Sequence, residues 1–139
     1  MTRYMLILRS TPAAEESMAN VDFEDVIAAM GRFNEELIKA GVLLAGEGLA
    51  GPEDGFVVDF DSGTPVVTDG PYTEAKELFN GFWVVAVSSI EEAKQWAVKC
   101  PLGPGARLEG RRITETEEFP QDNEWVQKEL RWKKEGVWK

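Results

Sequence analysis

Apolar residues recur with a helical spacing between residues 22 and 40, the clearest helical pattern in the chain. The positions that follow the 3.6-residue period are Phe23, Ile27, Met30, Phe33, Leu37 and Ile38. Asp22 is suited to cap the N-terminus of this helix, and Gly41 suits the left-handed position just beyond its C-terminus. The pattern therefore predicts a helix over residues 22–40 whose apolar face is buried.

Two continuous apolar runs, residues 4–8 and residues 82–87, are typical of central strands that are covered on both faces. The second run contains no polar residue. Shorter β-prone segments at residues 42–49 and 107–113 predict two further strands. Together these segments supply four strands for one sheet.

A hairpin is predicted between the strands at residues 42–49 and 82–87. Residues 56–60 and 64–68 are β-prone, and Asp61-Ser62-Gly63 between them has the composition of a tight turn. A capping box beginning at Ser88 or Ser89 predicts a second helix, which Pro101 ends. The resulting order, with two helices separated by strands of a mostly antiparallel sheet, predicts an α+β ferredoxin-like sandwich with an added hairpin.

The last 26 residues differ from the rest of the chain. Trp125 and Trp132 lie seven positions apart, beside Val126 and Leu130, which predicts an amphipathic helix ending at Gly136. An isolated helix of this length is marginal in water, so we expect it to pack on its own subunit or on a neighbour. The chain is thus divided into a domain of residues 1–113 and a helical extension of residues 114–139.

The composition excludes several classes of chemistry. The chain has no histidine and a single cysteine, so a Ser-His or Cys-His pair, a zinc site and an internal disulfide are not expected. A net charge of −10 argues against nucleic-acid binding. No apolar run approaches the length of a membrane span. We therefore expect a cytoplasmic protein with no metal and no cofactor.

The charge is also unevenly distributed. The first 70 residues hold 13 acidic and only 4 basic side chains, whereas residues 71–139 are nearly balanced. A charged face is most often merely solvated, but a ligand of the first half would be neutral or cationic.

The segment from Val67 to Glu77, with Asp69-Gly70-Pro71-Tyr72 at its centre, resembles the signature of the YCII-related family. It is most similar to the branch with the DGPF motif, with Tyr72 in place of phenylalanine. The opening residues 3–6, residues 45–49, residues 99–101 and the pair Glu109 and Arg111 are similar to that family as well. The resemblance implies a ferredoxin-like subunit that pairs with a second copy into a dimeric α/β barrel.

Enzymes related to this family, such as proteins similar to chloromuconolactone dehalogenase, are thought to use a His-Asp pair. That pair does not carry over to a chain without histidine. A homodimer is also expected on physical grounds, because one face of the small sheet would otherwise expose the apolar side chains of residues 4–8 and 82–87.

Asp69 has two interpretations. In the first, Asp69-Gly70-Pro71 is turn chemistry: Asp69 accepts a hydrogen bond from the backbone two residues on, Gly70 permits a positive φ, and Pro71 fixes the exit. In the second, Asp69 is a carboxylate at the mouth of a pocket, where desolvation would raise its pKa and make it a base, with Lys76 as its counter-charge. The sequence does not decide between them.

A ligand pocket is predicted around this motif from residues that surround it or that carry a suitable charge. Its members are Arg9, Gly70, Pro71, Tyr72, Glu74 and Lys76. Arg9 and Arg111 are suited to bind a ligand carboxylate, although an ordinary salt bridge is the commoner use of such residues. Glu47 and Glu77 are weaker candidate acids, and Cys100, near the C-terminus of a helix, is expected to be structural.

Three functions remain open. The first is a small-molecule-binding or regulatory domain without histidine-based catalysis. The second is a lyase- or isomerase-type enzyme that acts on small carbonyl or lactone substrates through Asp69. The third is an interaction protein built around its dimer and its tryptophan-rich tail.

Overall fold

The computed structural model describes residues 1–70 and 77–138. Four antiparallel strands form the main sheet, in the order β2 (Leu43–Gly48), β5 (Leu78–Val87), β1 (Thr2–Ser10) and β6 (Arg107–Arg112). The two continuous apolar runs of the sequence therefore lie in the two central strands, as predicted. This topology is that of a ferredoxin-like α+β fold.

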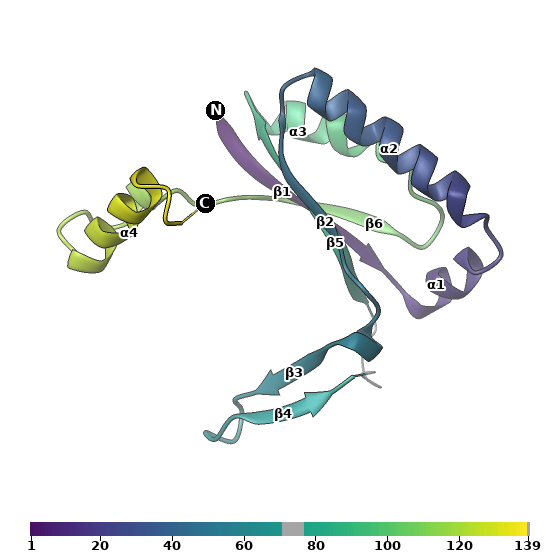
Figure 1. Cartoon of the computed structure of the whole chain (residues 1–139), viewed down its shortest axis with the longest axis horizontal. Helices are drawn as coiled ribbons and strands as arrows, with labels where there is room; N and C mark the ends of the chain where they lie inside the picture. The colour runs from purple at the N-terminus through teal and green to yellow at the C-terminus, as the bar shows by residue number, and fades with distance from the viewer. Residues whose placement is uncertain (71–76, 139) are drawn as a thin grey trace.

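Helices α2 (Phe23–Lys39) and α3 (Ile90–Ala97) cover one face of this sheet (Figure 1). The side chain of Asp22 accepts a hydrogen bond from the backbone N–H of Glu24, and Gly41 has a φ of +73°, so both predicted helix boundaries are confirmed. Ser89 caps α3 by accepting from the backbone N–H of Glu92.

The core lies between these two helices and the sheet, where the side chains of alternate strand positions meet the inner faces of the helices. The buried apolar residues are Tyr4, Leu6, Phe33, Leu37, Val42, Trp83, Val85, Val87 and Ala93. The prediction that the whole apolar set of α2 is buried was wrong. Phe23, Ile27 and Ile38 are exposed, and the stripe around Phe33 and Leu37 is the part of the helix that joins the core.

The other face of the sheet is not covered by any described element of this chain. Its apolar side chains come from the alternate positions of β1 and β5, and all are only partly buried. These residues are Met5, Ile7, Phe82, Val84 and Ala86, and we call them the open face. The prediction that both central strands are covered on both faces thus holds on only one face within a single chain.

A short helix, α1 (Pro12–Met18), was not predicted from the sequence. Thr11 caps it by accepting from the backbone N–H of Ala14, and Pro12 occupies the first turn, where its missing N–H is no loss. Only Ala14 is buried, so the segment lacks the apolar period that would reveal a helix. The cap and the proline were the only available signals.

The predicted hairpin is present as a separate two-stranded ribbon of β3 (Phe56–Asp59) and β4 (Val66–Asp69), preceded by the 3-10 turn η1 (Pro52–Asp54). After β6 the chain passes through a second 3-10 turn, η2 (Thr116–Glu118), to α4 (Glu124–Lys134). The predicted tail helix is thus confirmed, and Gly136 has the positive φ of its C-terminal end. Both the ribbon and α4 project from the body (Figure 1).

Candidate functional site

Arg9, predicted to bind a ligand, lies at the irregularity near the end of β1, where the register shifts between Leu8 and Arg9. Its guanidinium donates a hydrogen bond to the carboxylate of Glu77 and lies 3.4 Å from a carboxylate oxygen of Glu109. The hydrogen bond raises the pKa of Arg9 and lowers the pKa of Glu77. The charge of Arg9 is therefore already matched within the chain, as in an ordinary salt bridge.

The same two carboxylates also engage two arginines of β6. Arg107 lies 3.7 Å from Glu77, and Arg111 lies 3.8 Å from Glu109. In the sheet register Arg9 is opposite Arg107, Ile7 is opposite Glu109 and Met5 is opposite Arg111, so this network lies on the same side of the sheet as the open face. It forms a charged border to the apolar surface.

Asp69 is exposed at the end of β4, directly opposite Phe56 in the ribbon. No element of the described chain buries it, so the desolvation that would turn it into a base is not supplied by this chain alone. Its catalytic role stays a prediction. Four other predicted pocket residues, Pro71, Tyr72, Glu74 and Lys76, lie outside the described residues.

Gly70 has a clear local reason to be glycine, but it is not the predicted one. Its φ is not positive. Instead its N–H donates to the carbonyl of Gly55 (2.9 Å), and a Cβ at this position would lie 1.7 Å from the carbonyl oxygen of Pro52. Gly70 therefore allows the base of the ribbon to close, a structural role that differs from the positive φ predicted for it.

A cavity of about 290 Å³ lies between α2 and the ends of β2 and β5, and we call it the α2 cavity. Its origin is a pair of glycines, because Gly48 of β2 is directly opposite Gly81 of β5. Neither has a side chain, so the side of the sheet that faces α2 is bare at this point. Leu8, Met30 and Trp83 supply apolar walls around the bare patch.

The polar part of the α2 cavity is set by Trp83 and Asn34. The indole N–H of Trp83 donates to the side-chain oxygen of Asn34 (2.8 Å), and Phe33 packs edge-on against the Trp83 ring, with ring centroids 5.5 Å apart. This contact fixes the Asn34 amide at the cavity wall. Glu47 and Asn80 also line the cavity, and Asn80 donates to the carboxylate of Glu15 on α1.

The site residues Asn34, Trp83 and Asn80 were not predicted from the sequence. Two signals were present. Asn34 is a polar residue beside Phe33 on the buried side of α2, and Trp83 carries an N–H inside an otherwise apolar strand, where it needs an acceptor. Glu47 was weighed from the sequence only as a weak candidate acid, and among the described residues it is the one predicted acid that lines the cavity.

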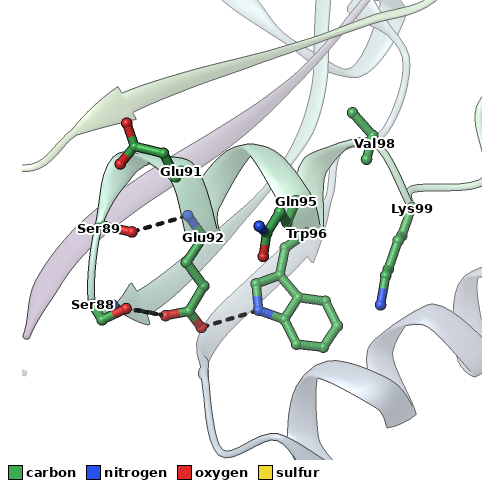
Figure 2. A pocket seen from close by; sticks show the side chains of 8 residues that line it. All are labelled: Ser88, Ser89, Glu91, Glu92, Gln95, Trp96, Val98 and Lys99. Atoms are coloured by element: carbon green, nitrogen blue, oxygen red, sulfur yellow. Dashed lines mark hydrogen bonds between the residues drawn. The ribbon is translucent and has the colours of Figure 1, made fainter.

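A second hollow, at the N-terminus of α3, is explained by helix capping (Figure 2). The carboxylate of Glu92 accepts from the N–H and the hydroxyl of Ser88 (both 2.8 Å) and from the indole of Trp96 (3.3 Å). These bonds lower the pKa of Glu92. Lys99 lies 4.8 Å from the Trp96 ring centroid. The main polar group of this hollow is thus satisfied by the cap itself.

Cys100 is half-buried beside the core, and this burial raises the pKa of its thiol to about 11. A thiol with this pKa is almost entirely protonated near neutral pH and is a poor nucleophile. The expectation of a structural cysteine is consistent with this environment. Among residues 1–70 and 77–138, no three His, Cys, Asp or Glu side chains gather in a way that could hold a metal ion.

The fold and the cavity define a small ferredoxin-like domain with room for one small molecule. A family model for the YCII-related domain matches residues 2–117. This covers most of the chain, and the protein therefore belongs to the YCII-related family. Comparison with curated proteins returned no match. None of the described helices combines the length and the apolar character needed to cross a bilayer.

Proposed function

We propose that this chain is a small-molecule-binding member of the YCII-related family and that its ligand occupies the α2 cavity. The observation that carries the proposal is the bare patch at Gly48 and Gly81 beneath Asn34 and Trp83. Its volume, about 290 Å³, is close to the lower limit of known ligand pockets, which suits a compact molecule. Apolar walls beside a fixed amide favour a ligand with an apolar body and one hydrogen-bonding group.

The charge of the surroundings narrows the ligand class. Glu15 is bonded to Asn80 at the wall of the cavity, and the first 70 residues carry 13 acidic against 4 basic side chains. A ligand anion would be repelled there, whereas a neutral or cationic group would not. Small neutral carbonyl compounds, lactones and primary amines are therefore the classes to test.

Glycine 48 offers a direct way to block the cavity. A Cβ at Gly48 meets no atom within 4 Å, so Gly48→Leu should enter the cavity without a clash. A Cβ at Gly31, on α2, likewise meets nothing, and Gly31 does not line the cavity, so Gly31→Leu is the matched control.

Saturation-transfer NMR with a panel of small lactones, ketones and primary amines tests the proposal. We expect members of the panel to bind the natural chain and Gly31→Leu but not Gly48→Leu. Absence of binding to the natural chain, or equal binding to Gly48→Leu, would contradict it.

We further propose that the chain works as a homodimer whose two open faces pack together. Contiguous apolar patches of this kind are rarely left exposed in monomers, and a two-fold axis would cover both copies at once. The charged border formed by Arg9, Glu77 and Glu109 would then flank the apolar centre on the β6 side, as the polar rim of an interface does. Light scattering should return twice the 15.5 kDa of one chain, and a mass near 15.5 kDa would contradict the dimer.

We also place the chain in the DGPF branch of the family, on the strength of Asp69-Gly70-Pro71 followed by Tyr72. The close approach of Gly70 to Pro52 gives the glycine of that motif a structural reason.

A further inference from the structure

The β3–β4 ribbon carries an apolar face that its own chain leaves exposed. In an antiparallel pair, residues directly opposite each other share a face, so Phe56, Asp69, Val58 and Val67 lie on one side of the ribbon. Phe56 is 64% exposed and Val67 is 63% exposed. A lone two-stranded hairpin is at best marginally stable in water, so this face needs a covering surface.

Helix α4 carries a second exposed apolar surface. Trp125 and Trp132 are seven residues apart on one side of the helix, and they are 59% and 37% exposed. Lys128 lies between them in sequence, with its ammonium 4.1 Å from the Trp125 ring centroid. We call this side the tryptophan face of α4.

The base of α4 is anchored, so the tryptophan face has a defined direction. Arg3 of β1 forms a bidentate pair with Glu115 (2.8 and 2.9 Å), and Arg112 of β6 forms another with Glu118 (2.7 and 2.9 Å). Lys133 donates to the buried hydroxyl of Thr116 (2.7 Å). The two arginine pairs hold the η2 segment on the sheet, and the Lys133 bond ties α4 to η2, on which α4 packs.

The two surfaces have opposite charge. The segment that contains the ribbon, residues 53–69, holds five carboxylates and no lysine or arginine: Glu53, Asp54, Asp59, Asp61 and Asp69. By contrast, α4 holds four basic residues and two acidic ones. Opposite charges beside matching apolar faces favour association of the two surfaces and fix its orientation.

Within one chain the two surfaces do not meet. Figure 1 shows the ribbon and α4 projecting from different ends of the sheet, both on the side away from α2 and α3. That is the side of the open face. A second copy packed on the open face would therefore lie between the ribbon and α4 of the first copy, and its own two arms would lie beside the first copy.

From these observations we infer that the tryptophan face of α4 in one copy packs on the Phe56, Val58 and Val67 face of the ribbon in the other copy. The inference rests on the homodimer proposed above and adds a second, exchanged contact to it. Asp69, which shares that face of the ribbon, then lies beside the basic residues of the second copy's α4. Asp69, the first residue of the motif, would thus be part of a subunit contact.

Cysteine cross-linking between two distinguishable full-length chains tests this contact. Both carry Cys100→Ser, one adds Val67→Cys, and the other adds Trp132→Cys with a mass tag. The chains are mixed, allowed to exchange and treated with a short bifunctional maleimide. The matched control replaces Val67→Cys by Ile27→Cys, because Ile27 is also exposed but lies on α2.

We expect a covalent heterodimer from the Val67→Cys and Trp132→Cys chains at least several-fold above the Ile27→Cys control. Thermal melts verify that each chain is folded, and light scattering reports its mass. A dimeric mass with no cross-link above the control would overturn the exchanged contact and leave the dimer standing. A monomeric mass would overturn both, and ligand binding at the α2 cavity is measured independently of either.

Discussion

Filling the α2 cavity should stabilise the protein, which distinguishes this cavity from an ordinary surface depression. In Gly48→Leu, the new side chain projects into space that is empty for 4 Å around its Cβ and is walled by Met30 and Trp83. The backbone there has no positive φ, so a leucine is not strained. The substitution therefore adds apolar contacts and removes the conformational freedom of glycine from the unfolded chain.

The magnitude follows from two contributions. Replacing glycine by a residue with a side chain contributes about 0.5–1 kcal/mol through the unfolded state. Full burial of a leucine contributes about 1.5–3 kcal/mol, and because the cavity is open to solvent we take about half of that. The free energy of unfolding should thus rise by about 2 kcal/mol, whereas Gly31→Leu, in the exposed interior of a helix, should gain only about 1 kcal/mol.

Urea denaturation followed by circular dichroism measures both variants, with the chain concentration held fixed because an oligomer's stability depends on it. In thermal melts, at roughly 4 °C per kcal/mol, the melting temperature should rise above that of the natural chain by about 8 °C for Gly48→Leu and about 4 °C for Gly31→Leu. A fall in stability of Gly48→Leu, with the expected rise in Gly31→Leu, would refute the description of the cavity.

Three further outcomes are expected. Asn34→Leu leaves the Trp83 indole N–H without its acceptor and should lower the free energy of unfolding by about 1–3 kcal/mol. Asn34→Asp keeps an acceptor oxygen, so its free energy of unfolding should fall by less. Equal decreases for the two variants in urea denaturation would contradict this. Burial raises the pKa of the Cys100 thiol to about 11, so its reaction with Ellman's reagent should be slow at pH 7 and its rate should rise about tenfold per pH unit up to pH 9. A rate that does not change with pH would contradict the burial of this thiol. Arg112 and the N–H of Glu115 lower the pKa of Glu118 from 4.5 to about 2, so its contribution to stability is present above pH 4.5 and is lost as the pH falls toward 2. Glu118→Gln should therefore flatten the acid dependence of thermal stability in that window. An unchanged slope would count against the ion pair with Arg112.

Local rules in the sequence predicted most of the fold. Asp22 and Gly41 mark the ends of α2, which sequence analysis finds because capping depends on only a few neighbouring residues. Residues 82–87 identified a central strand because an uninterrupted apolar run of this length is typical of strands inside a sheet. The short helix α1 was missed because its one buried residue, Ala14, sets no period.

The candidate site was less accessible to sequence analysis because it depends on register. The α2 cavity exists because Gly48 and Gly81, 33 positions apart in the chain, are opposite each other in the sheet. No local pattern reveals such a pairing. The Asp69 motif, in contrast, was conspicuous in the sequence, yet the structure places Asp69 on an exposed ribbon rather than in the lining of the cavity.

The most direct test of the central claim is the response of individual backbone and indole N–H resonances to a bound member of the ligand panel. In ¹⁵N–¹H spectra, we expect the largest shifts at the Trp83 indole and at the backbone of Asn34, Gly48 and Gly81, which surround the α2 cavity. Shifts confined to Asp69 and the β3–β4 ribbon, with the Trp83 indole unchanged, would contradict the proposal and place the ligand at the motif instead.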